Sequence, residues 1–170
     1  MSELREIRFW YVYNSHVRKK YLRAILGLPK EEILKDRRAS YPSILDIFLH
    51  VLDGYRYFFF VVKEGQPEEK YPQWRGNTAI DQLRQREREL DRRVMNSIDS
   101  LSEEDLHRKV MEGAFELRDL LNHMVEEELQ HRGELNAIFW QMNMNPPISD
   151  IDDAKYVRMH LTGQSCPLCA

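Results

Sequence analysis

The chain has 170 residues, of which 42% are hydrophobic and 31% are charged, and its net charge is −3. This length predicts one domain with one substantial core. The balanced charge argues against a nucleic-acid-binding protein, and no apolar run reaches the roughly 18 residues of a membrane span. The first residues are charged and do not resemble a secretory signal, so we expect a cytoplasmic protein without membrane attachment.

The first predicted helix spans Glu3 to Leu26, and Gly27 and Pro29 mark its end. Its apolar residues keep helical spacing: Leu4, Ile7, Tyr11, Leu22 and Ile25. His16 lies among basic residues of this helix, and we interpret it as solvated rather than as a ligand. A charged connection, residues 29–39, follows.

The second predicted helix runs from Tyr41 to Lys63, with Ser40 as its N-cap and Gly65 after its end. It is apolar on almost every side, which is typical of a central, buried helix. One polar stripe interrupts this surface and comprises Asp46, His50, Asp53 and Tyr57. This stripe faces either water or a polar site inside the protein.

The third predicted helix begins at Thr78 and Asp81, which form a pattern like a capping box, and ends near Ile98. Its charged side is expected to be solvated. A loop, residues 66–77, precedes it. The connection after it, residues 100–113, contains a short helical turn at 102–105 and a brief extended stretch at 106–111.

The last long helix, residues 114–143, carries an unusual set of polar residues beside its apolar stripe. His131 lies near the middle of that stripe, seven residues from both Met124 and Ile138. Glu127 precedes His131 by four residues, so the two side chains lie one above the other. A buried charge needs a partner, and this spacing allows two ligands to reach one metal ion.

A second helix must then supply a third ligand, and His50 in the polar stripe of the second helix is the best candidate. We therefore predict a metal site formed by His50, Glu127 and His131. Two imidazoles and one carboxylate suit a divalent ion such as zinc, nickel, iron or manganese. His123 lies about 12 Å from His131 along the helix axis. It is either an outer partner of Glu127 or a histidine at the edge of the core.

Four long amphipathic helices with one long connection predict an all-α four-helix bundle. We assign the bundle to residues 1–160 and a flexible, irregular C-terminal tail to residues 161–170. The tail contains Cys166 and Cys169, which we interpret as a mobile dithiol, the alternative being zinc bound between two chains. We expect the protein to be a homodimer.

Over residues 4–158 the chain resembles the DinB/YfiT-like superfamily of small metal-binding four-helix bundles. The resemblance rests on His50 in the second helix and on the late stretch Leu-Leu-Asn-His-Met-Val-Glu-Glu-Glu-Leu-Gln-His-Arg-Gly-Glu, residues 120–134. In the family this stretch usually reads His-x-x-x-His-x-x-x-His-Arg-Gly-Gln, and the second and third histidines bind the metal. His131 and His50 match ligand positions, and His123 matches the first, non-ligand histidine. Glu127 stands where the family has the middle histidine, and Glu134 stands where glutamine is usual.

The resemblance implies a metal-dependent enzyme, a transferase or hydrolase whose small-molecule substrate is a low-molecular-weight thiol. An alternative is a non-catalytic, stress-related or scaffold protein on the same fold. A di-iron carboxylate bundle is a further alternative, because Glu128 and His131 form the Glu-x-x-His half-motif and Glu104 and His107 repeat it. The sequence does not select among substrates or metals.

Overall fold

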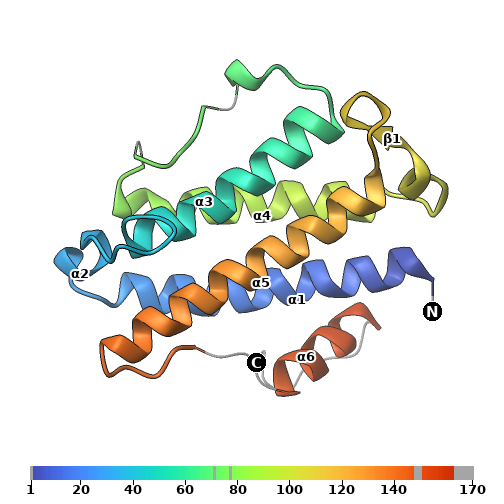
Figure 1. The fold of residues 1–170 in the computed structure, drawn as a ribbon. Coiled ribbons are helices and arrows are strands. Elements are labelled where there is room, and N and C mark those ends of the chain that lie inside the picture. Colours follow the sequence, from blue (N-terminus) through green and yellow to red (C-terminus); the bar gives the residue numbers. More distant parts are fainter. Residues whose placement is uncertain (1, 71, 77, 148–150, 163–170) are drawn as a thin grey trace.

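Four long helices form the body of the molecule, and in the computed structural model they pack as a bundle (Figure 1). The structure describes residues 2–70, 72–76, 78–147 and 151–162. The bundle helices are α1 (Glu3–Leu26), α3 (Ile44–Arg56), α4 (Leu83–Asp99) and α5 (Leu117–Gln141). Helix α1 packs against α4 and α5, and α3 packs against the same two helices. The predicted all-α fold is confirmed.

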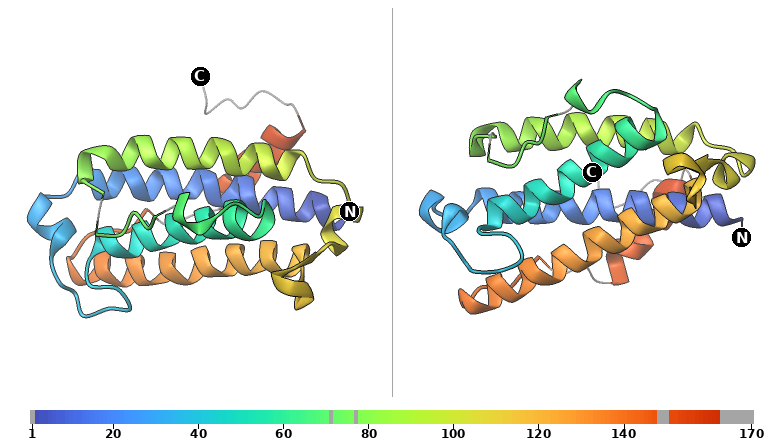
Figure 2. Two further views of the ribbon diagram at one scale, coloured as in Figure 1. Left: turned by 90° about the horizontal axis from the view of Figure 1, so that it is seen from above. Right: turned by 45° about the horizontal axis from the view of Figure 1, so that its top comes forward.

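Helix α3 continues into a π-helix, η1 (Tyr57–Lys63), which ends before Gly65. Gly65 has a φ of 66°, a conformation that glycine adopts without steric cost. Together α3 and η1 cover residues 44–63, whereas the sequence predicts the second helix over Tyr41 to Lys63. Figure 2 shows that this continuous segment lies beside α5 over most of its length.

Short elements connect the bundle helices. A five-residue helix, α2 (Lys30–Leu34), lies in the connection after α1, where the sequence analysis expected none. The loop after η1 holds the 3₁₀ turn η2 (Glu68–Lys70), and η3 (Ile80–Gln82) leads into α4. Helix α6 (Ile151–Leu161) packs against α1. These segments cover the ends and one side of the bundle (Figure 1).

A small hairpin precedes α5. After the 3₁₀ turn η4 (Glu104–His107), strand β1 (Lys109–Val110) pairs antiparallel with β2 (Phe115–Glu116). The register places Lys109 opposite Glu116 and Val110 opposite Phe115. The turn between the strands, η5 (Met111–Gly113), has left-handed backbone at both Met111 and Glu112. The connection contains a helical turn and an extended stretch, as predicted, but the turn spans Glu104–His107 instead of 102–105 and the strand covers only Lys109–Val110 of the predicted 106–111.

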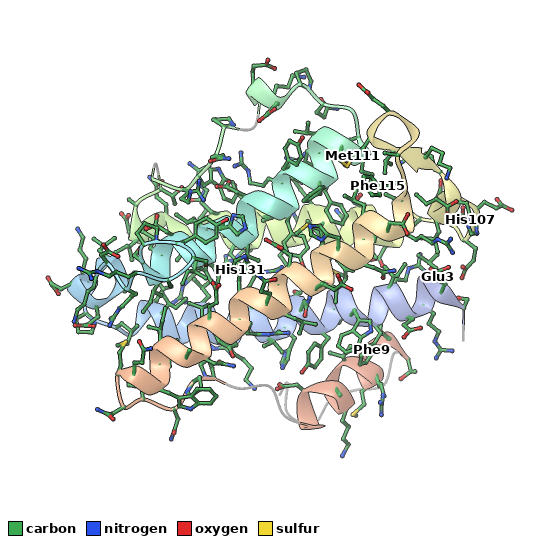
Figure 3. All side chains as sticks on the ribbon, viewed as in Figure 1. Glu3, Phe9, His107, Met111, Phe115 and His131 are labelled. Carbon is green, nitrogen blue, oxygen red and sulfur yellow. The ribbon has the colours of Figure 1, made fainter. Side chains whose placement is uncertain are left out.

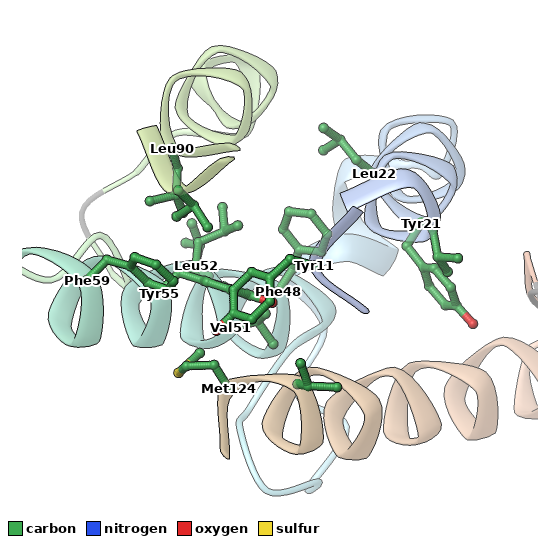
Figure 4. Packing of buried hydrophobic residues seen from close by; sticks show 14 of the residues in the cluster. Tyr11, Tyr21, Leu22, Phe48, Val51, Leu52, Tyr55, Phe59, Leu90 and Met124 are labelled. Atoms are coloured by element: carbon green, nitrogen blue, oxygen red, sulfur yellow. The ribbon is translucent and has the colours of Figure 1, made fainter. Parts of the chain in front are cut away.

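The core lies between the four long helices and is rich in aromatic side chains (Figure 4). Tyr11, Tyr55 and Phe59 pack on one another, with the rings of Tyr11 and Phe59 in an edge contact at 5.6 Å. Burial of such side chains contributes about 1.5–3 kcal/mol each. No described helix is both long enough and apolar enough to cross a membrane.

Three predicted helix starts are wrong. Helix α3 is capped by Ser43, whose Oγ accepts a hydrogen bond from the Asp46 backbone N–H at 3.1 Å, and not by Ser40. Thr78 does not cap α4, because that helix begins at Leu83 without a side-chain cap. Helix α5 begins at Leu117, three residues later than predicted. Its capping box uses the side chains of Glu116 and Asp119, and the preceding residues belong to the hairpin.

Candidate metal centre

His50, Glu127 and His131 converge where the middle of α3 meets α5. The Glu127 Oε1 atom lies 2.8 Å from His50 Nε2 and 3.1 Å from His131 Nε2. One ligand atom from each residue lies within 4.8 Å of the other two. The imidazole rings of His50 and His131 are nearly perpendicular, with centroids 4.7 Å apart. The structure thus brings the three predicted residues together, and their role as metal ligands stays a prediction.

The donor atoms fit the dimensions of a mononuclear site. Two donors held at about 2.0–2.2 Å from one ion, at octahedral or tetrahedral angles, lie roughly 3.0–3.5 Å apart. The two distances to Glu127 Oε1 are close to this range, and all three donor atoms lie within 4.8 Å of one another, so the two imidazoles would move toward each other around an ion. Two imidazole nitrogens and one carboxylate oxygen are ligands of zinc and of several other first-row metals. The residues therefore fit a divalent ion.

Glu127 is held in its ionised form. Burial alone raises the pKa of this carboxyl group, but hydrogen bonds from His50 and His131 outweigh burial and leave the pKa below its ordinary value. A metal ligand must be deprotonated, so the neighbouring imidazoles prepare Glu127 for this role. A bound cation would take the place of the imidazole protons that now face the carboxylate.

A second carboxylate orients His131 from the other side. His131 Nδ1 donates to Glu134 Oε2 at 2.9 Å, and Ser40 Oγ donates to the same oxygen at 2.6 Å. Metal-binding histidines usually donate their second ring N–H to such a partner, which fixes the ring and raises its basicity. The side chain of His131 is only 4% exposed, so its orientation is also fixed by packing.

Tyr41 covers the His50 side of the site. Its ring stacks on the His50 ring at a centroid distance of 4.1 Å, and its hydroxyl lies 3.0 Å from His50 Nε2. The Arg75 guanidinium also lies over the Tyr41 ring, 4.8 Å from its centroid. Arg75 belongs to the loop between η2 and η3. Asp53 holds this loop against α3 by accepting hydrogen bonds from the backbone N–H groups of Trp74 and Arg75.

Sequence reasoning missed Tyr41, Ser40 and Arg75 as neighbours of the site. Their positions depend on how two loops fold over α3, and no periodic pattern reports that. Glu134 was detectable, because it follows His131 by three residues and therefore lies on the same helix face. The polar stripe of the second helix divides: His50 faces the site and Asp53 binds the loop that contains Trp74, whereas Tyr57 is exposed.

The other histidines have different surroundings. His123 is exposed, and its ring contacts Phe58 edge to face with centroids 5.6 Å apart. His16 is not simply solvated, since its Nε2 lies 2.8 Å from Asp153 Oδ1 on α6. His107 lies in η4 and contacts Glu116. The side chain of His160 and both cysteines, Cys166 and Cys169, lie outside the described part of the structure.

Glu128 takes no part in the candidate centre. It is 4% exposed, and its Oε2 accepts hydrogen bonds from Arg18 at 2.6 Å and from Tyr55 at 2.7 Å. The carboxylate is therefore already neutralised by a buried guanidinium. Glu104 and His107 lie in a short 3₁₀ turn and not on a bundle helix. These positions argue against the di-iron alternative.

The sequence was also compared with known proteins and with protein families. A search of curated proteins found no match to the chain. A sequence model of the DinB superfamily matches residues 14–135, which is more than half of the chain and includes His50, Glu127 and His131. The helical fold agrees with that match. The chain belongs to the DinB superfamily.

Proposed function

We propose that the protein is a metal-dependent enzyme that uses a low-molecular-weight thiol, as a transferase or hydrolase, at a single divalent ion held by His50, Glu127 and His131. One observation carries the proposal: one imidazole from α3 converges with an imidazole and an ionised carboxylate from α5. Three protein ligands leave at least one coordination position for water or substrate. A bound divalent ion would lower the pKa of a water or thiol at that position.

The residues around the centre suit a thiol substrate. Two neutral imidazoles and the Glu127 carboxylate would leave a divalent ion with a net positive charge, which attracts a thiolate. The side chains of His50 and Glu127 are 25% and 22% exposed, so a small molecule can approach from that side. Glu134 holds the His131 ring in place, and the Tyr41 ring shields one face of His50.

The choice among zinc, nickel, iron and manganese is left to measurement, because the donor set suits each of them. The protein should first be purified without chelator and its metal content determined. We expect about one divalent ion per chain. The purified enzyme should then be screened for consumption of low-molecular-weight thiols with electrophilic or hydrolysable co-substrates.

The outcomes separate the enzyme from its alternatives. Thiol-dependent turnover that chelator removes and metal restores supports the proposal. Metal at one ion per chain without turnover across the screen favours the non-catalytic scaffold on the same fold. Two ions per chain with an oxo-bridge absorption band would return the di-iron alternative. Equal metal content in the parent and in His131→Ala would contradict the site itself.

We also propose that the protein is a homodimer in the cytoplasm. Support for the dimer comes from exposed apolar side chains on one face of α5: Leu129 is 41% exposed and Trp140 is 56% exposed. Gly133 and Ala137 lie between them at helical spacing and are also exposed. Light scattering should give about twice the chain mass of 20.4 kDa. A monomer at micromolar concentration would contradict the dimer.

A further inference from the structure

A second feature lies on the same seam between α3 and α5 as the candidate centre. Two rows of residues, each at four-residue steps, face each other across the seam: His50, Gly54 and Phe58 on one side, and His123, Glu127 and His131 on the other. The rows are antiparallel, because the His50 ring contacts His131 while the Phe58 ring contacts His123. Eight residues of helix separate the two ends, which is about 12 Å.

A cavity occupies the end opposite the candidate centre, and we call it the seam pocket. Its volume is about 340 Å³, near the lower end of the roughly 300–1,000 Å³ typical of small-molecule sites. It is lined by Phe58, Met111, Phe115, Asp119, Leu120 and His123. The lining is mainly apolar, with one imidazole and one carboxylate, which is the composition of a pocket for an apolar or aromatic group.

The hairpin before α5 presents two large apolar side chains at this pocket. Met111 is 43% exposed and Phe115 is 50% exposed, and Figure 3 shows both near the hairpin end of α5. Met111 and the next residue, Glu112, have φ values of 51° and 57°. Such backbone costs a non-glycine residue about 1 kcal/mol or more and is common at binding sites. The hairpin thus exposes the apolar side chains of Met111 and Phe115 to water beside the seam pocket.

The middle of the seam contains a glycine of α3 against which Met124 of α5 packs. Gly54 is the central member of its row, so α3 has no side chain there. The position is only partly buried, and an added Cβ would lie 3.3 Å from Met124 Cε. Glycine inside a helix destabilises it by roughly 0.5–1 kcal/mol relative to alanine. Close packing of Met124 accounts for glycine at this position.

We propose that the seam pocket binds the apolar, ring-bearing end of the small molecule whose thiol reaches the candidate metal centre. The substrate class is therefore an amphiphilic thiol with an aromatic or branched apolar group about 12 Å from the sulfur. Phe58 and His123 provide ring edges and faces for aromatic contacts, which favour offset or edge-to-face geometry. The thiol half of this inference rests on the proposed function, and the pocket half rests on the cavity alone.

Two synthetic thiols test the inference on the intact, cobalt-loaded protein. The long probe is 8-phenyloctane-1-thiol, whose ring can reach the seam pocket while its sulfur is at the centre. The short probe is 2-phenylethanethiol, whose ring cannot. Each is titrated by the thiolate-to-cobalt absorption band. We expect the long probe to bind at least tenfold more tightly than the short one.

Substitutions in and beside the seam pocket test where the phenyl ring of the long probe binds. His123→Trp fills the pocket and should abolish the tenfold preference for the long probe while leaving the affinity of the short probe unchanged. The matched control is Asn122→Trp, which adds the same side chain at the neighbouring exposed residue and should keep the preference. Phe58→Ala should reduce the preference. A preference that survives His123→Trp would overturn the inference.

Two further readouts keep the pocket separate from the metal chemistry. If neither thiol produces the absorption band, the proposed function fails. The pocket half is then tested by NMR on metal-free protein, where the long probe should shift the amide signals of Phe58 and His123. Absence of those shifts would overturn the pocket. If His123→Trp changes the oligomeric state instead of probe affinity, the pocket belongs to a contact between copies and the inference is also overturned.

Discussion

Glu127 contributes the negative charge of the candidate centre, at a position where the resemblance leads one to expect histidine. Its Oε1 contacts the Nε2 atoms of both histidines, so it is the residue that joins the two halves of the site. Its ionised state follows from those contacts, which outweigh the effect of burial on its pKa. A carboxylate at this position lowers the net charge of the occupied site and makes oxygen-preferring ions better competitors.

Glu127→His tests this interpretation of the charge. The substitution keeps the four-residue spacing to His131, so the geometry of a three-histidine set remains available. We expect metal binding to persist, with preference moved toward zinc or nickel, because these ions favour imidazole. Competitive loading with zinc and manganese, followed by metal analysis, gives the ratio. An unchanged zinc-to-manganese ratio would show that residue 127 does not reach the ion.

Glu134 tests the support of His131. Glu134→Ala removes the acceptor of the Nδ1 hydrogen bond and should lower metal affinity about 10–100-fold, as loss of such outer partners generally does. Glu134→Gln keeps a carbonyl acceptor and should cost less. Chelator competition measures both affinities. If the two variants lose the same affinity, charge rather than hydrogen bonding is the contribution of Glu134.

At the scale of elements, the start of α3 positions His50. Ser43→Ala removes the N-cap hydrogen bond to the Asp46 backbone and should destabilise the protein by about 1 kcal/mol. Ser40→Ala is the matched control, since Ser40 makes its side-chain contact with Glu134 and should change stability by less than about 0.5 kcal/mol. Urea denaturation measures both. A larger loss for Ser40→Ala would mean that the helix begins earlier.

The error at this helix start has a local explanation. Ser40 and Ser43 both precede an apolar run, but only Ser43 is followed three residues later by an acidic residue, Asp46. That signal was present in the sequence and favours Ser43. The start of α5 differs, because the hairpin pairing that takes Phe115 and Glu116 is a contact between strands that helical periodicity does not report.

Periodicity predicted more of the site than of its surroundings. The helical phase of His131 and Glu127 is a local property, so their common face could be read from spacing alone. His50 is one of the few polar residues on an otherwise apolar helix, and that contrast predicts its role. Tyr41 and Arg75 lie in loops, and their approach to His50 depends on backbone conformations that no repeating pattern specifies.

At the scale of the whole molecule, a buried ion network joins three bundle helices. Arg18 of α1 contacts Glu128 of α5 at 2.6 Å and Asp91 of α4 at 3.1 Å, and its Nε lies 3.5 Å from Glu87 Oε1. Burial raises the pKa of Glu87 more than the nearby Arg18 lowers it. Among the described residues Glu87 Oε1 has no hydrogen-bond partner, whereas Glu128 Oε2 accepts two hydrogen bonds.

Glu128→Gln and Glu87→Gln should therefore affect stability in opposite directions. Glu128→Gln leaves Arg18 without its closest counter-charge and should cost about 3 kcal/mol or more. The pKa of Glu87 in the folded protein is raised above the ordinary 4.5. Its contribution to stability is therefore present below about pH 4.5 and is lost as the pH rises through the raised pKa. Glu87→Gln should thus be at least as stable as the parent at pH 7.

Urea denaturation at pH 4.5 and pH 7 checks both parts. The difference in stability between Glu87→Gln and the parent should become more favourable to the variant at the higher pH, because the parent must then ionise a buried carboxyl group. The contrary result is that Glu87→Gln, measured against the parent, is less stable at pH 7 than at pH 4.5. It would mean that the ionised Glu87 carboxylate is a net favourable partner of Arg18.

The most direct measurement of the central claim is X-ray absorption on the zinc-loaded protein, paired with titration of two variants. We predict a coordination shell with two imidazoles and one carboxylate at about 2.0–2.2 Å. Glu127→Gln should weaken binding sharply, because the amide lacks the charge, whereas Glu126→Gln on the exposed face of α5 should bind zinc as the parent does. A sulfur shell, or equal affinity in both variants, would contradict the centre formed by His50, Glu127 and His131.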